Sequence, residues 1–154
     1  MSEMESPADY AAEVAAARDR LVGFVGLCSD AAWESVSAVE GDPRPVGVIV
    51  DHVADAYEYL ATWIRALLDG ESVDVTGEVV DELNARHALA ASDVTRKQAV
   101  AHLQRSGDML VALIRSLNPE ALDLDSGRVR RFAKIAALHA DSHQREVESP
   151  RASA

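Results

Sequence analysis

The sequence predicts an all-α fold, a four-helix bundle with a long crossover between its second and third helices. Hydrophobic residues make up 48% of the 154 residues, but only 5% are aromatic, and alanine is abundant. This composition favours closely packed helices over sheets, because aromatic and β-branched residues favour strands. Four long segments also repeat apolar residues at the 3.6-residue period of a helix, with recognisable start and stop signals.

The first helix is predicted to begin at Ser6-Pro7, an N-cap residue followed by proline at the first helical position. Its apolar stripe consists of Tyr10, Val14, Ala17, Leu21, Phe24, Val25 and Cys28. We expect Cys28 to be a small core residue rather than a reactive thiol. A short turn that carries Trp33 follows this helix, and the Gly- and Pro-containing segment 41–45 predicts a loop.

The second helix is predicted from Pro45 to Leu68, and Gly70 suits the left-handed position after its end. The next 3.6-residue pattern does not begin until residue 95, so the segment 70–94 is much longer than an antiparallel helical hairpin needs. That length allows the chain to return along the bundle. We therefore expect the second and third helices to run parallel, with a short helix over GEVVDELNARHALA (77–90) in the crossover.

The third helix begins at Thr95, which forms a Thr-x-x-Gln capping box, and ends at Asn118 before a proline. The fourth is predicted from about Gly127 to Glu148. Residues 149–154 are expected to be a flexible tail after a single bundle domain spanning residues 1–148.

The charge balance argues against nucleic acid as a partner. With 15 basic and 26 acidic residues, the formal net charge is −11, and such a surface repels phosphate backbones. No apolar run approaches the ~18 residues of a membrane span, and residues 1–10 lack the pattern of a secretory leader. The single cysteine excludes an intramolecular disulfide, so we expect a cytoplasmic protein that acts on a small molecule.

Near the C-terminus, the sequence LHADSHQREV places His139 and His143 four residues apart. Residues at this spacing lie one turn apart on the same helix face, so their imidazoles can converge on one metal ion. Both follow the apolar stripe of the fourth helix, where burying an unpartnered imidazole costs ~1–3 kcal/mol. A metal would satisfy both side chains.

His52, in the middle of the second helix, is the candidate for a third ligand. Three imidazoles with one open position are typical of a catalytic metal site rather than a closed structural one. The alternative is that each histidine is simply a hydrogen-bonded residue near the bundle surface. His102 is expected to face solvent, and His87, in the crossover, either covers the mouth of the site or is an ordinary residue of a loop or short helix.

In sequence, nearly the whole chain resembles the DinB/YfiT-like superfamily. The segments that carry the resemblance are LCSDAAW (27–33), DHVAD (51–55), LLDGE (67–71) and HADSH (139–143). The resemblance implies a DinB-like four-helix bundle whose metal triad is here His52, His139 and His143. It also implies a divalent metal such as Zn, Ni or Fe that stabilises the thiolate of mycothiol, bacillithiol or glutathione, since a divalent metal lowers the pKa of a bound thiol.

Two acids are candidate catalytic residues. Many relatives have Gln three residues after the last histidine, whereas this chain has Glu146. Its carboxylate can orient His143, act as a base or join the metal shell; the alternative is that it simply faces solvent. Asp55 lies three residues after His52 and is either part of the site or a surface acid. We expect the protein to be a thiol-dependent S-transferase. The alternatives are a metal-dependent hydrolase and a non-catalytic metal- or ligand-binding bundle. The sequence is compatible with a homodimer.

Overall fold

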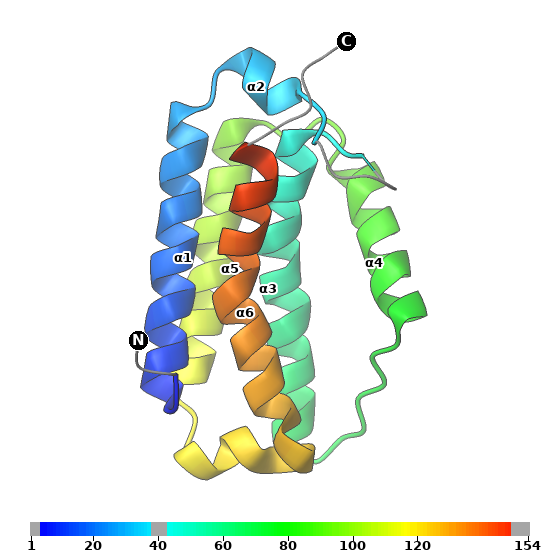
Figure 1. Ribbon diagram of the computed structural model, residues 1–154. Coiled ribbons are helices and arrows are strands. Elements are labelled where there is room, and N and C mark those ends of the chain that lie inside the picture. Colours follow the sequence, from blue (N-terminus) through cyan, green and yellow to red (C-terminus); the bar gives the residue numbers. More distant parts are fainter. Residues whose placement is uncertain (1–3, 38–42, 149–154) are drawn as a thin grey trace.

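The computed structural model describes residues 4–37 and 43–148. Four helices form the bundle: α1 (Pro7–Leu27), α3 (Val46–Leu68), α5 (Arg96–Arg115) and α6 (Leu124–Glu148). In Figure 1, α1 and α6 run in one direction while α3 and α5 run in the other, so the second and third bundle helices are parallel, as predicted. The predicted tail 149–154 and the first two residues of the predicted loop 41–45 lie outside the described residues.

The crossover contains the helix α4 (Gly77–Ala90), which matches the short helix predicted for this segment. Figure 1 shows α4 outside the four bundle helices, beside α3, and carrying the chain back from the end of α3 to the start of α5. The side chain of Thr76 caps it by accepting a hydrogen bond from the backbone N–H of Val79. A parallel pair of helices requires this return, because the chain must regain the full length of the bundle before α5 begins.

Local capping defines the ends of the bundle helices. Ser6 and Asp9 form a reciprocal capping box at the start of α1, and Thr95 and Gln98 form one at the start of α5. The segment before the predicted fourth helix was not anticipated. It contains the 3₁₀ helix η1 (Pro119–Asp123) and then a left-handed kink at residues 125–127 inside α6, after which the regular helix continues.

The core lies between the four bundle helices. The buried part of the α1 stripe is Tyr10, Val14, Ala17, Leu21 and Val25. Phe24 and Cys28 are only half-buried, because α1 nears its end there and fewer neighbours cover it. Burial nevertheless raises the pKa of the Cys28 thiol, which keeps it protonated and unreactive at neutral pH. None of the helices in the described part of the chain is long and apolar enough to cross a membrane.

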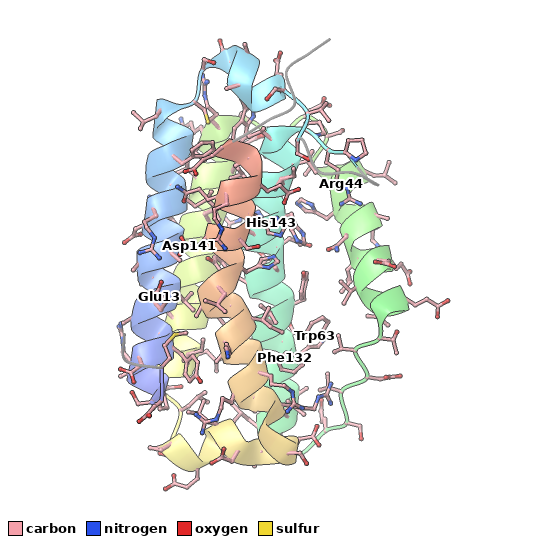
Figure 2. All side chains as sticks on the ribbon, in the orientation of Figure 1. Glu13, Arg44, Trp63, Phe132, Asp141 and His143 are labelled. Carbon is pink, nitrogen blue, oxygen red and sulfur yellow. The ribbon has the colours of Figure 1, made fainter. Side chains whose placement is uncertain are left out.

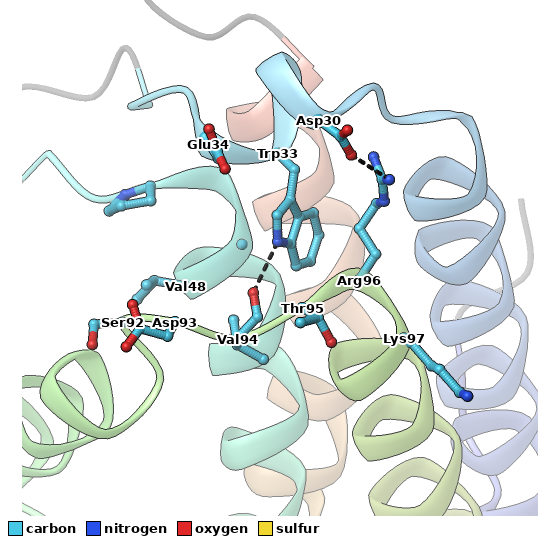
Figure 3. A pocket seen from close by; sticks show the side chains of 12 residues that line it. Asp30, Trp33, Glu34, Val48, Ser92, Asp93, Val94, Thr95, Arg96 and Lys97 are labelled. Atoms are coloured by element: carbon cyan, nitrogen blue, oxygen red, sulfur yellow. Dashed lines mark hydrogen bonds and ion pairs between the residues drawn. The ribbon is translucent and has the colours of Figure 1, made fainter.

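Trp33 joins three parts of the chain at one end of the bundle. It lies on the short helix α2 (Asp30–Glu34), packs against Gly47 of α3, and donates its indole N–H to the carbonyl of Val94 at 3.0 Å (Figure 3). A Cβ on residue 47 would lie only 2.7 Å from Cε2 of Trp33. Glycine at this position therefore allows the indole to hold α2, α3 and the end of the crossover together.

Replacing Gly47 by alanine is expected to lower the free energy of unfolding by about 1–3 kcal/mol, because the added methyl group overpacks the contact with Trp33. Gly23→Ala is the matched control: no atom lies within 4 Å of a Cβ at this exposed position of α1, so that change should raise stability by up to about 1 kcal/mol. Chemical denaturation measures both. Shifts of the same sign would contradict the packing argument.

Candidate metal centre

Three histidines from two antiparallel helices converge in the upper half of the bundle. His52 comes from α3, and His139 and His143 come from successive turns of α6; Figure 2 labels His143. One ring nitrogen of each lies within 4.8 Å of a ring nitrogen of the others. The Nε2 atoms of His52 and His139 are 3.2 Å apart, and the ring centroids are separated by 4.5 to 5.1 Å. The structure thus brings together the three predicted ligands.

Small buried residues lie beside these histidines on α6. Ala136, three residues before the first histidine of the pair, and Ala140, directly after it, are completely buried. Small side chains at buried positions let the α6 backbone pack closely against its neighbours in the bundle, α1 and α3. His52 itself is 8% exposed and is surrounded on α3 by the buried residues Ile49 and Val53. The three histidines therefore occupy positions where a bundle otherwise has aliphatic side chains.

The local environment keeps the imidazoles of His52 and His139 neutral. Burial lowers the pKa of His52 to about 2, and the neighbouring His139 and His143 lower it further by repulsion. Burial, followed by repulsion from His143, lowers the pKa of His139 to about 3. Neutral imidazole carries the lone pair that a metal ion requires.

The donor set fits a divalent metal. His52 Nδ1 is buried without a hydrogen-bond partner, and the Nε2 atoms of His52 and His139 can satisfy one another only when one carries a hydrogen and the other a lone pair. A cation bound by all three rings would replace this mutual contact and use one lone pair of each ring. Three nitrogen ligands suit Zn²⁺, Ni²⁺ or Fe²⁺ and leave coordination positions open.

Glu146 contacts one of the three histidines. Its carboxylate accepts a hydrogen bond from Nδ1 of His143 at 2.7 Å, and its side chain is 20% exposed. This contact fixes the ring orientation and leaves Nε2 for a metal, which is the usual arrangement of a carboxylate behind a ligating histidine. Glu146 is thus a partner of His143 rather than a freely solvated acid, while its catalytic role stays a prediction.

The open side of the cluster faces a cavity of about 530 Å³, a size typical of small-molecule sites. His52, His143 and Glu146 form one wall. The rest of the lining comprises Arg44 from the segment before α3, Ile49 of α3, and Asp81, Asn84 and Ala85 of α4. Figure 2 shows Arg44 on the α4 side of the cavity, across from His143. The crossover helix thus closes the site that the bundle helices create.

A second polar network lies beside the three histidines. Asp51, next to His52 on α3, accepts hydrogen bonds from His87 of α4 at 2.7 Å and from His102 of α5 at 2.9 Å. The other nitrogen of His102 lies 2.7 Å from the carboxylate of Glu58. Burial alone would raise the pKa of Asp51, but the two histidine contacts outweigh it and lower the pKa to about 2. One buried carboxylate therefore ties three helices together.

The prediction that His102 faces solvent is wrong. Its side chain is only 18% exposed, and carboxylates contact both of its ring nitrogens, so both nitrogens carry a proton. The hydrogen bond to Asp51 is the main cause that raises its pKa. The rotation of α5 against α3, which helical spacing within one helix does not determine, places His102 opposite two acids of α3.

Asp51 is the site residue that the sequence reasoning missed. The available signal was its place in the apolar run GVIVDHVA, because a charged residue inside an otherwise buried helix segment needs partners from other helices. Asp55, the acid that was predicted, lies one turn further along α3. Asp55 does not line the cavity beside the three histidines. It lines a separate cavity of about 560 Å³ together with Asp51, His87 and His102. Its catalytic role remains a prediction.

A larger cavity, about 770 Å³, lies at the end of the bundle around Trp33 (Figure 3). The indole N–H is bonded to Val94, and Arg96 is paired with Asp30. No histidine or unpartnered buried side chain lines it among the described residues. Because its principal polar groups are already used by the fold, we assign the chemistry to the smaller cavity beside the three histidines.

Replacing Glu146 by alanine is expected to weaken Zn²⁺ binding about 10- to 100-fold, because the ring of His143 loses the carboxylate that orients it. Glu146→Gln should lose less, since its amide oxygen still accepts the hydrogen bond. Isothermal titration calorimetry measures the affinities. Glu148→Ala is the matched control on the same helix end, where the exposed carboxylate accepts a hydrogen bond from Gln144 rather than from a histidine. Equal affinities for the two alanine variants would exclude the orienting role.

Comparison with known proteins agrees with this geometry. The sequence model of the DinB superfamily matches residues 13–147, which include all or most of each bundle helix and all three histidines. No curated protein and no solved structure matches the chain. A match of this extent, together with the helical bundle and its three-histidine cluster, shows that the chain belongs to the DinB superfamily.

Proposed function

We propose that this protein is a metal-dependent enzyme that activates a low-molecular-weight thiol and transfers its sulfur to a small electrophile. The observation that carries the proposal is the convergence of three imidazoles with an open side on a cavity of about 530 Å³. A closed structural site would have a fourth protein ligand, and the described chain supplies only three. An open position beside a cavity is what a reacting ligand needs.

The chain's own residues would hold and orient the reactants. His52, His139 and His143 would hold the divalent metal, and Glu146 fixes the orientation of His143 through Nδ1. When bound, the metal lowers the pKa of a thiol at the open position, so that a thiolate forms at neutral pH. The cavity wall formed by Arg44 and α4 then accommodates the rest of the thiol and the electrophile. Mycothiol, bacillithiol and glutathione are the candidate thiols.

A hydrolase that activates water is the second candidate function. Glu146 favours it, because this chain has a carboxylate at the edge of the cavity, within reach of a molecule beside the three histidines. Such a carboxylate can accept a proton from an attacking water. The two functions use the same open position and differ in the molecule that fills it.

The purified protein is expected to retain about one divalent metal ion per chain, whereas a His139→Ala/His143→Ala variant should retain almost none, because two of three ligands are lost. Elemental analysis of both proteins measures the difference. Gln144→Ala, a change on the same stretch of α6, is the control and should keep its metal. The same metal content in all three proteins would rule out the three-histidine site.

Metal-loaded protein is expected to bind at least one of mycothiol, bacillithiol and glutathione, and metal-free protein should bind none of them. The physical reason is that the metal supplies the interaction with the thiolate sulfur. Calorimetric titration of each thiol into both forms of the protein provides the measurement. If no thiol binds the metal-loaded form, the transferase proposal fails and the hydrolase or a non-catalytic binding bundle takes its place.

A further inference from the structure

Arg44 is the only arginine or lysine among the described residues that line the cavity beside the three histidines. It belongs to the segment before α3 and lies across the cavity from His143 (Figure 2). The candidate metal ligands and this guanidinium therefore form opposite walls of one space of about 530 Å³. A ligand that spans this space contacts both walls.

Contacts with two other segments hold Arg44 in place. Its Nη1 atom donates a hydrogen bond to the backbone carbonyl of Asn84, which lies on α4 and lines the same cavity, at 3.0 Å. Its own carbonyl accepts a hydrogen bond from the backbone N–H of Ser37 at 3.0 Å. A guanidinium carries five N–H donors on one rigid plane, so a bond to a carbonyl fixes its orientation while the group can serve further partners at the same time.

Two carboxylates also line the cavity, but they differ from Arg44 in position and exposure. Glu146 lies on the side of the metal ligands, where its carboxylate accepts a hydrogen bond from His143 at 2.7 Å. Asp81 is exposed on α4, whereas Arg44 is half-buried, so water screens the charge of Asp81 more strongly. The wall opposite the metal ligands therefore favours a negatively charged group on the ligand.

We propose that Arg44 is an anion-binding residue of this cavity and that it holds a carboxylate of one of the two reactants, at the end away from the metal. A carboxylate matches the planar guanidinium because parallel N–H···O bonds can form between them, whereas an alcohol brings no charge. This inference rests on the proposed function, because it names the chemical class of the molecules which that function joins. The carboxylate belongs either to the thiol or to the electrophile, and the experiment separates these two sources.

Simple thiols that differ only in their terminal group test the first source. Co²⁺-loaded protein is titrated with 3-mercaptopropionate and 3-mercaptopropanol, and with the longer pair 6-mercaptohexanoate and 6-mercaptohexanol, while visible absorption follows binding. At the chain length that reaches Arg44, the wild type should bind the acid about tenfold more tightly than the alcohol, the effect of one charge-assisted hydrogen bond. Arg44→Gln should remove this preference and leave the affinity for the alcohol unchanged.

Glutarate and 1,5-pentanediol test the second source. They are titrated by calorimetry into Co²⁺-loaded protein that is already saturated with 3-mercaptopropanol, so that they can occupy only the part of the cavity left for the electrophile. A preference for glutarate that disappears in Arg44→Gln, without a matching preference among the thiols, assigns the carboxylate to the electrophile.

Two further variants separate a direct contact from a general effect of charge. Arg44→Lys keeps the charge but loses the planar fork, so it should retain part of the preference for the acid. Arg86→Gln is the matched control on α4, because it removes the same charge from an exposed side chain that pairs with Glu82 and does not line the cavity. It should bind every probe as the wild type does, and an equal loss of preference in both Gln variants would overturn the proposal.

The outcomes distinguish this inference from the proposed function. If neither the acids nor the alcohols bind the Co²⁺-loaded wild type, the transferase proposal fails and this inference fails with it. If the thiols bind but neither series shows a preference for the acid, only the role of Arg44 is overturned. A preference that persists in Arg44→Gln also overturns it, because the metal alone would then attract the carboxylate. Equal losses for acid and alcohol in that variant would show that Arg44 only positions α4.

Discussion

The structure depends on the packing of α3 against α6, which brings three imidazoles together at positions where a bundle normally has aliphatic side chains. His52 and His139 remain neutral because burial and the repulsion of neighbouring imidazoles disfavour their charged forms. A buried polar atom without a partner, such as Nδ1 of His52, reduces the stability of this interface. Marginally stable bundles keep such groups where function requires them.

Asp51 determines how the crossover meets the bundle. α4 makes few contacts with other helices apart from α3, and its amphipathic character is weak, so apolar packing alone would hold it loosely. The hydrogen bond between Asp51 and His87 provides a specific, buried attachment. Because His102 of α5 holds the other oxygen, the same carboxylate also sets the position of α5 against α3. The metal centre and this network are adjacent on α3, since His52 directly follows Asp51.

The arrangement separates two kinds of histidine by their partners. The three metal-ligand candidates face one another and a single carboxylate, which leaves their lone pairs available. His102 faces two carboxylates and holds a proton on each nitrogen. His87 stands between these groups, with one nitrogen on a carboxylate and the other without a partner. Chemical identity is the same in all five residues, and the surrounding charges decide which role each can take.

The sequence by itself determined the features that depend on local chain geometry. Capping residues and apolar spacing located the helices, the length of the crossover implied parallel helices, and the i, i+4 spacing placed His139 and His143 on one face. The left-handed kink before α6 and the partners of His87 and His102 were decided only by the tertiary structure. Helical spacing fixes which residues share a face of one helix, but the rotation and depth of neighbouring helices fix which faces meet. The role of Asp51 as an acceptor for two histidines depends on how neighbouring helices are placed, because these histidines lie 36 and 51 residues away along the chain.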